Sequence, residues 1–304
     1  MDIIIGIMRN ILEEGFIYGI MAMGVYISYS VLHFPDLSVD GTFPLGMCVT
    51  AALISSGVNP YVACVVAFIC GACAGCVTGL LHVKLRITDL LSGILVMTAM
   101  WSVNLVITRG SAVVPFYNKD TIFNSGAVSL LPDGLYAWRI FLISAVAAIA
   151  VKLILDLYLK TKSGLLLRAT GDNQQFVKSV SRDPGTMKII GLTIGNGCTA
   201  LAGSILSQVS ESANINSGTG MVVMGLASVI IGTSIFKRLS ILKPTAMVLT
   251  GSVLYRACLA VAMQLGLPTN YLKLLMAVIF TFALVANNVL AKGKKYETQQ
   301  GILQ

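Results

Sequence analysis

The feature that most limits how this chain can fold is its series of long apolar stretches. A transmembrane helix needs about 20 mostly apolar residues. Hydrophobic residues make up 56% of the sequence and charged residues only 11%. Lipid offers no partners for backbone polar groups, so such stretches fold as helices. We expect an all-α polytopic membrane protein, a single transmembrane domain over residues 1–304, with about nine spans. The expected spans are 15–32, 43–58, 61–83, 90–108, 136–158, 188–208, 218–236, 244–264 and 270–291.

The second and seventh stretches are short and contain glycines, so we expect one or two broken or re-entrant helices. A polar segment precedes each of them, at 33–44 and 211–220. Irregular backbone at membrane depth occurs where it is buried in protein or lines a cavity, which predicts a translocation path at the interface of an internal repeat. A simple turn outside the membrane explains the first segment equally well. The candidate path residues are Asp36, Ser38, Asp40, Thr42, Asn214, Asn216, Thr219 and Arg256.

Arg256 lies inside the eighth expected span, where a charge is costly and marks a polar interior. Its expected partners are Asp36, Asp40, Glu211 or backbone carbonyls. A structural ion pair, or a side chain that reaches toward the interface, is the alternative interpretation.

Basic residues predict the sidedness. They concentrate at 84–86, 160–188, 237–243 and 292–295, and alternating crossings place all four segments on one side. The positive-inside rule assigns that side to the cytoplasm. The net charge of +8 is therefore that of inner loops and not of a nucleic-acid surface. The C-terminus is then cytoplasmic, and loop 108–135 and the N-terminus lie outside.

The first 14 residues lack the basic start of a signal peptide, so we expect the first apolar stretch to remain as a span. Residues 1–12 are expected to form a separate amphipathic segment at the outer interface. An even number of spans with the N-terminus inside is the alternative topology.

Small residues recur at helix-packing spacing, at Gly71, Gly75 and Gly79 in the third span. Such residues let helix backbones approach closely in lipid, so we expect this face to contact another helix. Gly15 with Gly19, and Gly191 with Gly195, repeat the spacing.

No catalytic or metal-binding arrangement is readable. Cys70, Cys73 and Cys76 have an iron–sulfur-like spacing but no fourth ligand, so we interpret them as packing residues. His33 and His82 are the only histidines and have no companion ligands. We therefore expect no enzyme activity, no metal and no resident cofactor.

The segment 160–188 is basic and polar, yet it contains leucines and a phenylalanine. Gly171 and Pro184-Gly185 are breaks, and we expect a short helix between them. Such a helix favours a docking element for a cytoplasmic partner, although an ordinary amphipathic inner loop has the same composition. The sequence contains no nucleotide-binding Gly-x4-Gly-Lys-Ser/Thr motif, so ATP-driven work requires a separate subunit.

Taken in order, several motifs resemble the permeases of type II ABC importers, in the branched-chain amino acid and ribose group. The resemblance covers residues 15–288, and the order and spacing of the motifs are more specific than any one of them. The motifs are Tyr18–Gly24 with Asp36–Val39, Gly79–Ile87, Gly164–Ala169 with Asn173 and Gly185, Leu201–Gly203, Gly218–Gly220, and Ala227–Ser234.

The resemblance implies a permease subunit of the cell inner membrane, surrounded by lipid, that pairs with a second permease copy. It also implies two cytoplasmic ATP-binding subunits and an extracytoplasmic substrate-binding protein. The solute would be an amino acid, an aromatic one included, or another small polar solute. The chain lacks the additional first helix of the ribose permeases. The ATPase-coupling residues would be Leu167, Arg168, Ala169, Thr170, Asn173 and Phe176.

An ion-coupled secondary transporter is the alternative function, with Asp36 and Asp40 as ion-coupling carboxylates. It leaves segment 160–188 unexplained. An intramembrane enzyme is a further alternative, but the sequence contains no readable catalytic constellation for it.

Overall fold

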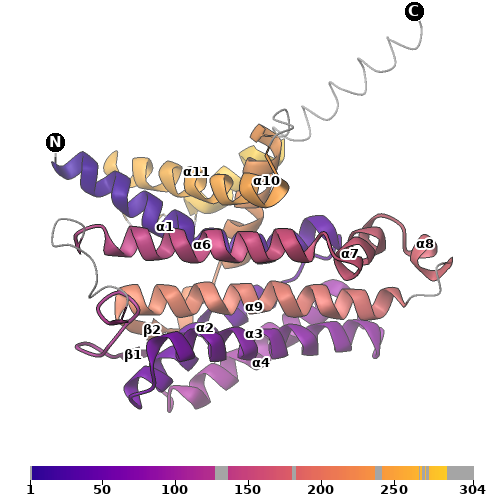
Figure 1. Cartoon of the computed structure of the whole chain (residues 1–304), viewed down its shortest axis with the longest axis horizontal. Coiled ribbons are helices and arrows are strands. Elements are labelled where there is room, and N and C mark those ends of the chain that lie inside the picture. Colours follow the sequence, from indigo (N-terminus) through magenta and orange to yellow (C-terminus); the bar gives the residue numbers. More distant parts are fainter. Residues whose placement is uncertain are drawn as a thin grey trace, which may run out of the picture.

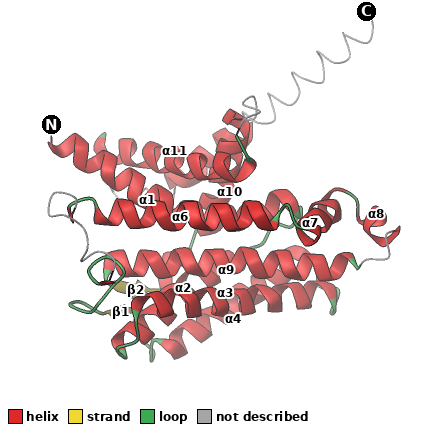
Figure 2. Cartoon of the chain, viewed as in Figure 1, coloured by secondary structure: helices red, strands yellow, loops and turns green. Residues whose placement is uncertain are grey.

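The computed structural model describes residues 2–126, 136–179, 183–236, 242–266, 268, 271 and 274–285. Its helices lie side by side in one bundle (Figures 1 and 2). Seven helices are long and apolar enough to cross a membrane, and two shorter apolar helices, Val39–Ser55 and Leu274–Val285, complete the set. The prediction of an all-α polytopic membrane protein is confirmed. The ninth expected span lies partly outside the described residues. Positions 127–135, 180–182, 237–241 and 292–295 lie wholly outside them.

The elements follow one another with short connections. They are α1 (Asp2–Tyr26), η1 (Ile27–Val31), α2 (Val39–Ser55), α3 (Pro60–Val83), α4 (Asp89–Ile107), β1 (Val113–Pro115), α6 (Arg139–Tyr158), α7 (Lys162–Asp172), α8 (Gln174–Ser179), α9 (Pro184–Ser210), β2 (Ser212–Asn214), η3 (Ile215–Gly218), α10 (Met221–Phe236) and α11 (Pro244–Gln264). The strands pair antiparallel, with Val113 opposite Asn214. They lie at the same end of the bundle as the start of α1, and α7 and α8 lie at the other end (Figure 1).

The two most buried spans are α1 and α9, which form the centre of the bundle. The glycine face of α3 packs on α9, as expected. A Cβ on Gly75 would overlap the carbonyl of Leu192, and one on Gly79 would lie 2.8 Å from the Cα of Ile189. Gly15 faces Val253 of α11 in the same way. Small residues thus set the close helix contacts that lipid alone would not drive.

Of two expectations about local structure, one was wrong and one is confirmed. Residues 1–12 do not form a separate segment, because α1 continues from Asp2 to Tyr26 without a proline or a turn to stop it. The short helix expected between Gly171 and Pro184 is present as α8, and a further short helix, α7, precedes it in segment 160–188. The α7 helix begins early because the Thr161 hydroxyl accepts a hydrogen bond from the Gly164 N–H and caps it.

Candidate functional site

The first broken segment connects α1 to α2 through five residues of π-helix, Ile27–Val31. Such widened turns are rare and concentrate at functional sites. The chain reverses at His33, which has a left-handed backbone with φ of 54°. The Phe34 N–H donates to the Ser28 carbonyl at 2.8 Å and closes the turn.

Three buried polar side chains follow this turn and form a hydrogen-bond network with a fourth, Asn196 of α9. Asp36 Oδ1 accepts from the Ser38 N–H at 2.8 Å and from the Ser38 hydroxyl at 2.6 Å. Asp36 Oδ2 accepts from Asn196 Nδ2 at 2.7 Å, and the Thr42 hydroxyl donates to Asn196 Oδ1 at 2.7 Å. Asn196 is the thirteenth of the 27 residues of α9. The break therefore sits near half the depth of the bundle and not in a loop outside it.

Asp40 joins the first broken segment to the second. It lies in the first turn of α2, and its carboxylate accepts hydrogen bonds from the backbone N–H groups of Val222 at 2.8 Å and Gly220 at 3.1 Å. These groups begin α10. Gly218 packs against the Asp40 carbonyl, where a Cβ would overlap it. The two helices thus meet at their N-termini, and one carboxylate compensates the positive end of each dipole.

At 1.5 Å per residue, α2 and α10 are about 26 and 24 Å long, shorter than the roughly 30 Å of bilayer hydrocarbon.

The two broken segments that the sequence suggested lie against each other in the structure. The second break runs from β2 through η3, where the Asn214 side chain accepts from the Asn216 N–H at 2.9 Å. The Thr219 hydroxyl donates to the Asn216 carbonyl at 3.0 Å. Asn216 and Thr219 are exposed on the bundle surface.

These contacts show the surroundings of three expected path residues. Asp36, Ser38 and Thr42 are 5% exposed or less, and each is bonded within the chain. They hold α2 to α9. Sequence reasoning missed Asn196, on which this network centres. A lone asparagine in the middle of an apolar span is a recognisable signal, because polar side chains at that depth need partners.

Arg256 has a different partner from those expected. Its guanidinium forms an ion pair with Glu14 of α1 and lies 4.9 Å from the centre of the Tyr18 ring. Asp36, Asp40 and Glu211 do not contact it in any hydrogen bond or ion pair between described residues. The ion pair joins α1 to α11 inside the bundle, which favours the structural role.

The segment at the opposite end from the strands divides into buried and exposed residues. Leu167 and Thr170 are buried completely within the chain, on the face of α7 that packs on the bundle. They attach α7 to the bundle, where Gly171 packs on the Val31 carbonyl of η1. Arg168, Asn173 and Phe176 are exposed, and Asn173 caps α8 by accepting from the Phe176 N–H at 3.1 Å.

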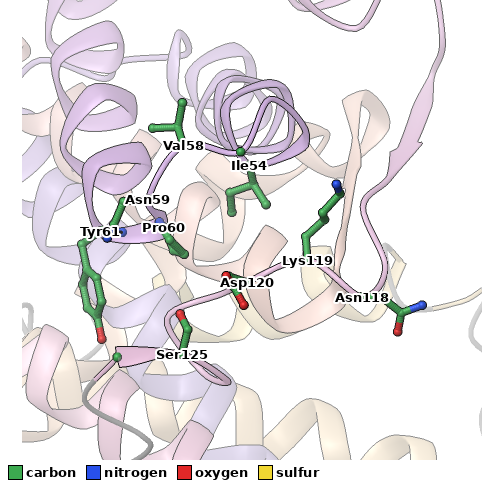
Figure 3. A pocket seen from close by; sticks show the side chains of 11 residues that line it. Ile54, Val58, Asn59, Pro60, Tyr61, Asn118, Lys119, Asp120 and Ser125 are labelled. Carbon is green, nitrogen blue, oxygen red and sulfur yellow. Dashed lines mark hydrogen bonds between the residues drawn. The ribbon is translucent and has the colours of Figure 1, made fainter.

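At the strand end of the bundle, a cavity of about 530 Å³ opens between the α2–α3 turn and the segment after β1. Asp120 and Ser125 carry their oxygens toward Pro60, while Asn118 points away (Figure 3). Lys119 also lines the cavity. This cavity is polar and open to the surroundings, whereas the helix faces around it are apolar. Among the described residues no group of three or more His, Cys, Asp or Glu side chains could hold a metal ion.

The bundle of apolar helices with two interrupted spans that meet at half depth defines a multi-pass membrane protein of the transporter class. The model of the family described as branched-chain amino acid transport system / permease component matches residues 7–284, so the chain belongs to this family.

Three relatives illustrate the similarity. The chain is 39% identical to the tyrosine transport system permease protein of Clostridioides difficile strain R20291, over 94% of this chain and 93% of that protein. It is 31% identical to the uncharacterized protein RP368 of Rickettsia prowazekii strain Madrid E, over 91% and 96%. It is 27% identical to the ribose import permease protein RbsC of Escherichia coli strain K12, over 73% and 68%. No solved structure matches the chain.

Proposed function

We propose that this chain is the membrane-spanning subunit of an ATP-driven importer whose solute is an amino acid with an aromatic side chain. The observation that carries the proposal is the similarity to the tyrosine transport permease, which extends over 94% of the chain. The chain forms the solute path and catalyses no bond chemistry. ATP is hydrolysed by a separate cytoplasmic subunit, since the sequence has no nucleotide-binding motif.

The α7–α8 segment docks this ATPase. It ends the bundle on the side with the basic segments 84–86 and 160–188, which the positive-inside rule assigns to the cytoplasm. Phe176 is 56% exposed and Arg168 is also exposed, and aromatic residues and arginines are typical of binding hot spots. Ala169 and Asn173 complete the docking surface.

The strand end then faces outside, together with the N-terminus. The binding protein that delivers the solute docks there, over the β1–β2 ribbon and the cavity beside Lys119 and Asp120. Asn216 and Thr219 are exposed polar residues within the span Ile215–Phe236. Polar groups at that depth are costly against lipid, so this face meets a second copy of the permease across the solute path.

The ion-coupled alternative would use Asp36 and Asp40. Both carboxylates accept hydrogen bonds from structural partners, Asn196 for one and the start of α10 for the other. A carboxylate that binds a transported ion must release such partners in every cycle, which favours the ATP-driven function.

Reconstitution separates the two functions. The permease is purified with the ATPase and binding protein encoded beside it and placed in proteoliposomes loaded with ATP. We expect uptake of radiolabelled tyrosine that requires ATP and the binding protein and persists without an ion gradient. Uptake that follows a sodium or proton gradient without ATP contradicts the proposal. ATP-dependent uptake of ribose but not of tyrosine keeps the importer and rejects the solute.

A further inference from the structure

A second cavity, of about 510 Å³, opens between η1 and α10, and neither family membership nor the sequence motifs assign it a role. The residues of the first break on its lining include Tyr29, Ser30 and His33. Thr233 and the apolar side chains of Val229 and Ile230 line the opposite side. Its volume falls within the range of about 300–1,000 Å³ that is usual for small-molecule sites.

Two backbone distortions form the cavity. The π-helix widens the end of α1, and the left-handed conformation of His33 turns its imidazole outward while Leu32 and Phe34 are buried. A non-glycine residue in this conformation costs on the order of 1–3 kcal/mol and persists where the surrounding structure maintains it, most often at functional sites.

Polar side chains of the first break line this cavity. The Tyr29 and Ser30 hydroxyls and the His33 imidazole have no hydrogen-bond partner among the described residues. Polar side chains are not left against lipid, and η1 lies inside the span Ile5–Val31. Water or a solute must therefore reach them.

The cavity lies on the ATPase side of the point where α2 and α10 meet. Its η1 wall touches α7, since Gly171 packs on Val31. Movement of α7 thus acts directly on one wall. None of the described residues on its lining is Asp, Glu, Lys or Arg, so these residues would bind a solute weakly, through hydrogen bonds and ring contact. Weak binding is what a conducting path requires for release.

We propose that this cavity is the inner chamber of the solute path, in which Tyr29, Ser30, His33 and Thr233 contact an aromatic amino acid on its way to the cytoplasm. The proposal rests on the proposed function. It adds the chemistry of the site: a zwitterion held by hydroxyl and imidazole groups, with its side chain against Val229 and Ile230.

Thr233 and Thr98 make a matched pair for the test. Each donates its hydroxyl to the carbonyls three and four residues earlier in its own helix, but Thr98 is exposed on α4, away from the cavity. In a background with the seven cysteines replaced, a water-soluble thiol reagent should label Thr233→Cys in membrane vesicles and not Thr98→Cys. Tyrosine at high concentration should slow the labelling of Thr233→Cys.

Transport gives a second measurement. Thr233→Trp should lower the initial rate of tyrosine uptake roughly tenfold or more, because an indole fills a space of this size, with ATPase association unchanged. Thr98→Trp should transport normally. His33→Gly keeps the left-handed backbone and should raise KM for tyrosine more than it lowers kcat.

The outcomes separate the chamber from the function. If Thr233→Cys is unreactive and Thr233→Trp transports normally while the wild type imports tyrosine, the chamber proposal fails and the importer stands. If the wild type imports nothing but Thr233→Cys reacts and tyrosine protects it, the importer function fails and the site remains. Labelling without protection by tyrosine rejects the solute contact.

Discussion

The carboxylate of Asp40 accepts a hydrogen bond of 2.8 Å from the backbone N–H of Val222, 182 residues later in the chain. Through this bond, a side chain in the first turn of α2 caps the N-terminus of α10. The two helices therefore meet at their N-terminal ends. Neither helix has a side-chain cap from its own N-cap residue that would replace it.

Removing this cap should destabilise the bundle. Asp40→Ala leaves the N–H groups of Gly220 and Val222 without their acceptor, at a cost of about 1–2 kcal/mol or more, as for other lost helix caps. Asp40→Asn should cost less, because its amide oxygen can still accept. Thermal unfolding in detergent measures both variants. Equal stability of Asp40→Ala and the wild type contradicts the capping role.

Asn196 should be as sensitive as Asp36, because each satisfies the other. Asn196→Leu deprives the Asp36 carboxylate of the 2.7 Å amide hydrogen bond and should destabilise by about 1–3 kcal/mol or more. The double variant Asp36→Ala, Asn196→Leu should be less unstable than the two losses added together. A double-mutant cycle of unfolding free energies measures this coupling, and strict additivity would show that the two side chains act independently.

The docking surface should depend on exposed residues only. Arg168→Glu should abolish association with the ATPase, and Phe176→Ala should weaken it roughly tenfold, as expected for a hot-spot aromatic. Lys84→Glu changes an exposed charge at the same end of the bundle and serves as the control. Pull-down of the ATPase from detergent extracts reports the result. Loss of binding in the control alone would place the docking surface elsewhere.

Two helical glycines should respond oppositely to a methyl group. Gly75→Ala places a Cβ against the Leu192 carbonyl and should destabilise the α3–α9 contact by about 1–3 kcal/mol, as overpacking does. Gly6→Ala has nothing within 4 Å of the added Cβ, so it should be neutral or slightly stabilising. The melting temperatures of the two variants test the difference, and similar shifts would reject the packing argument.

The Tyr255 hydroxyl is buried without a hydrogen-bond partner among the described residues. Tyr255→Phe removes this unsatisfied group and keeps the ring, so it should leave stability unchanged or raise it by about 1 kcal/mol. Unfolding in detergent checks the sign. A clear loss of stability would mean that the hydroxyl has a partner after all, such as a bound water.

The spans and the broken segments could be predicted because they rest on local composition. The run from His33 to Pro44 holds two carboxylates, two prolines and a glycine, which no continuous apolar helix would hold. The partners could not be predicted, because they lie far apart in the sequence. Arg256 pairs with Glu14 across 242 positions, and nothing near either residue indicates the other.

The division of α7 into a buried and an exposed face could have been predicted from the sequence. Gly164, Leu167 and Thr170 recur every three residues, which is the spacing of one helix face, and all three are buried. That spacing predicts a face packed on the bundle, and therefore predicts that the neighbouring Arg168 points outward. The family motif covers both faces, so it does not distinguish an attachment residue from a docking residue.

The pairing of Val113 with Asn214 has a mechanical consequence. Only five residues separate Asn214 from Gly220, whose N–H donates to the Asp40 carboxylate. A partner that pulls the outer loop therefore transmits its displacement through the ribbon to the first turn of α10, without bending a complete helix. If a binding protein docks on this ribbon, as we propose, its arrival would displace the start of α10 at half depth.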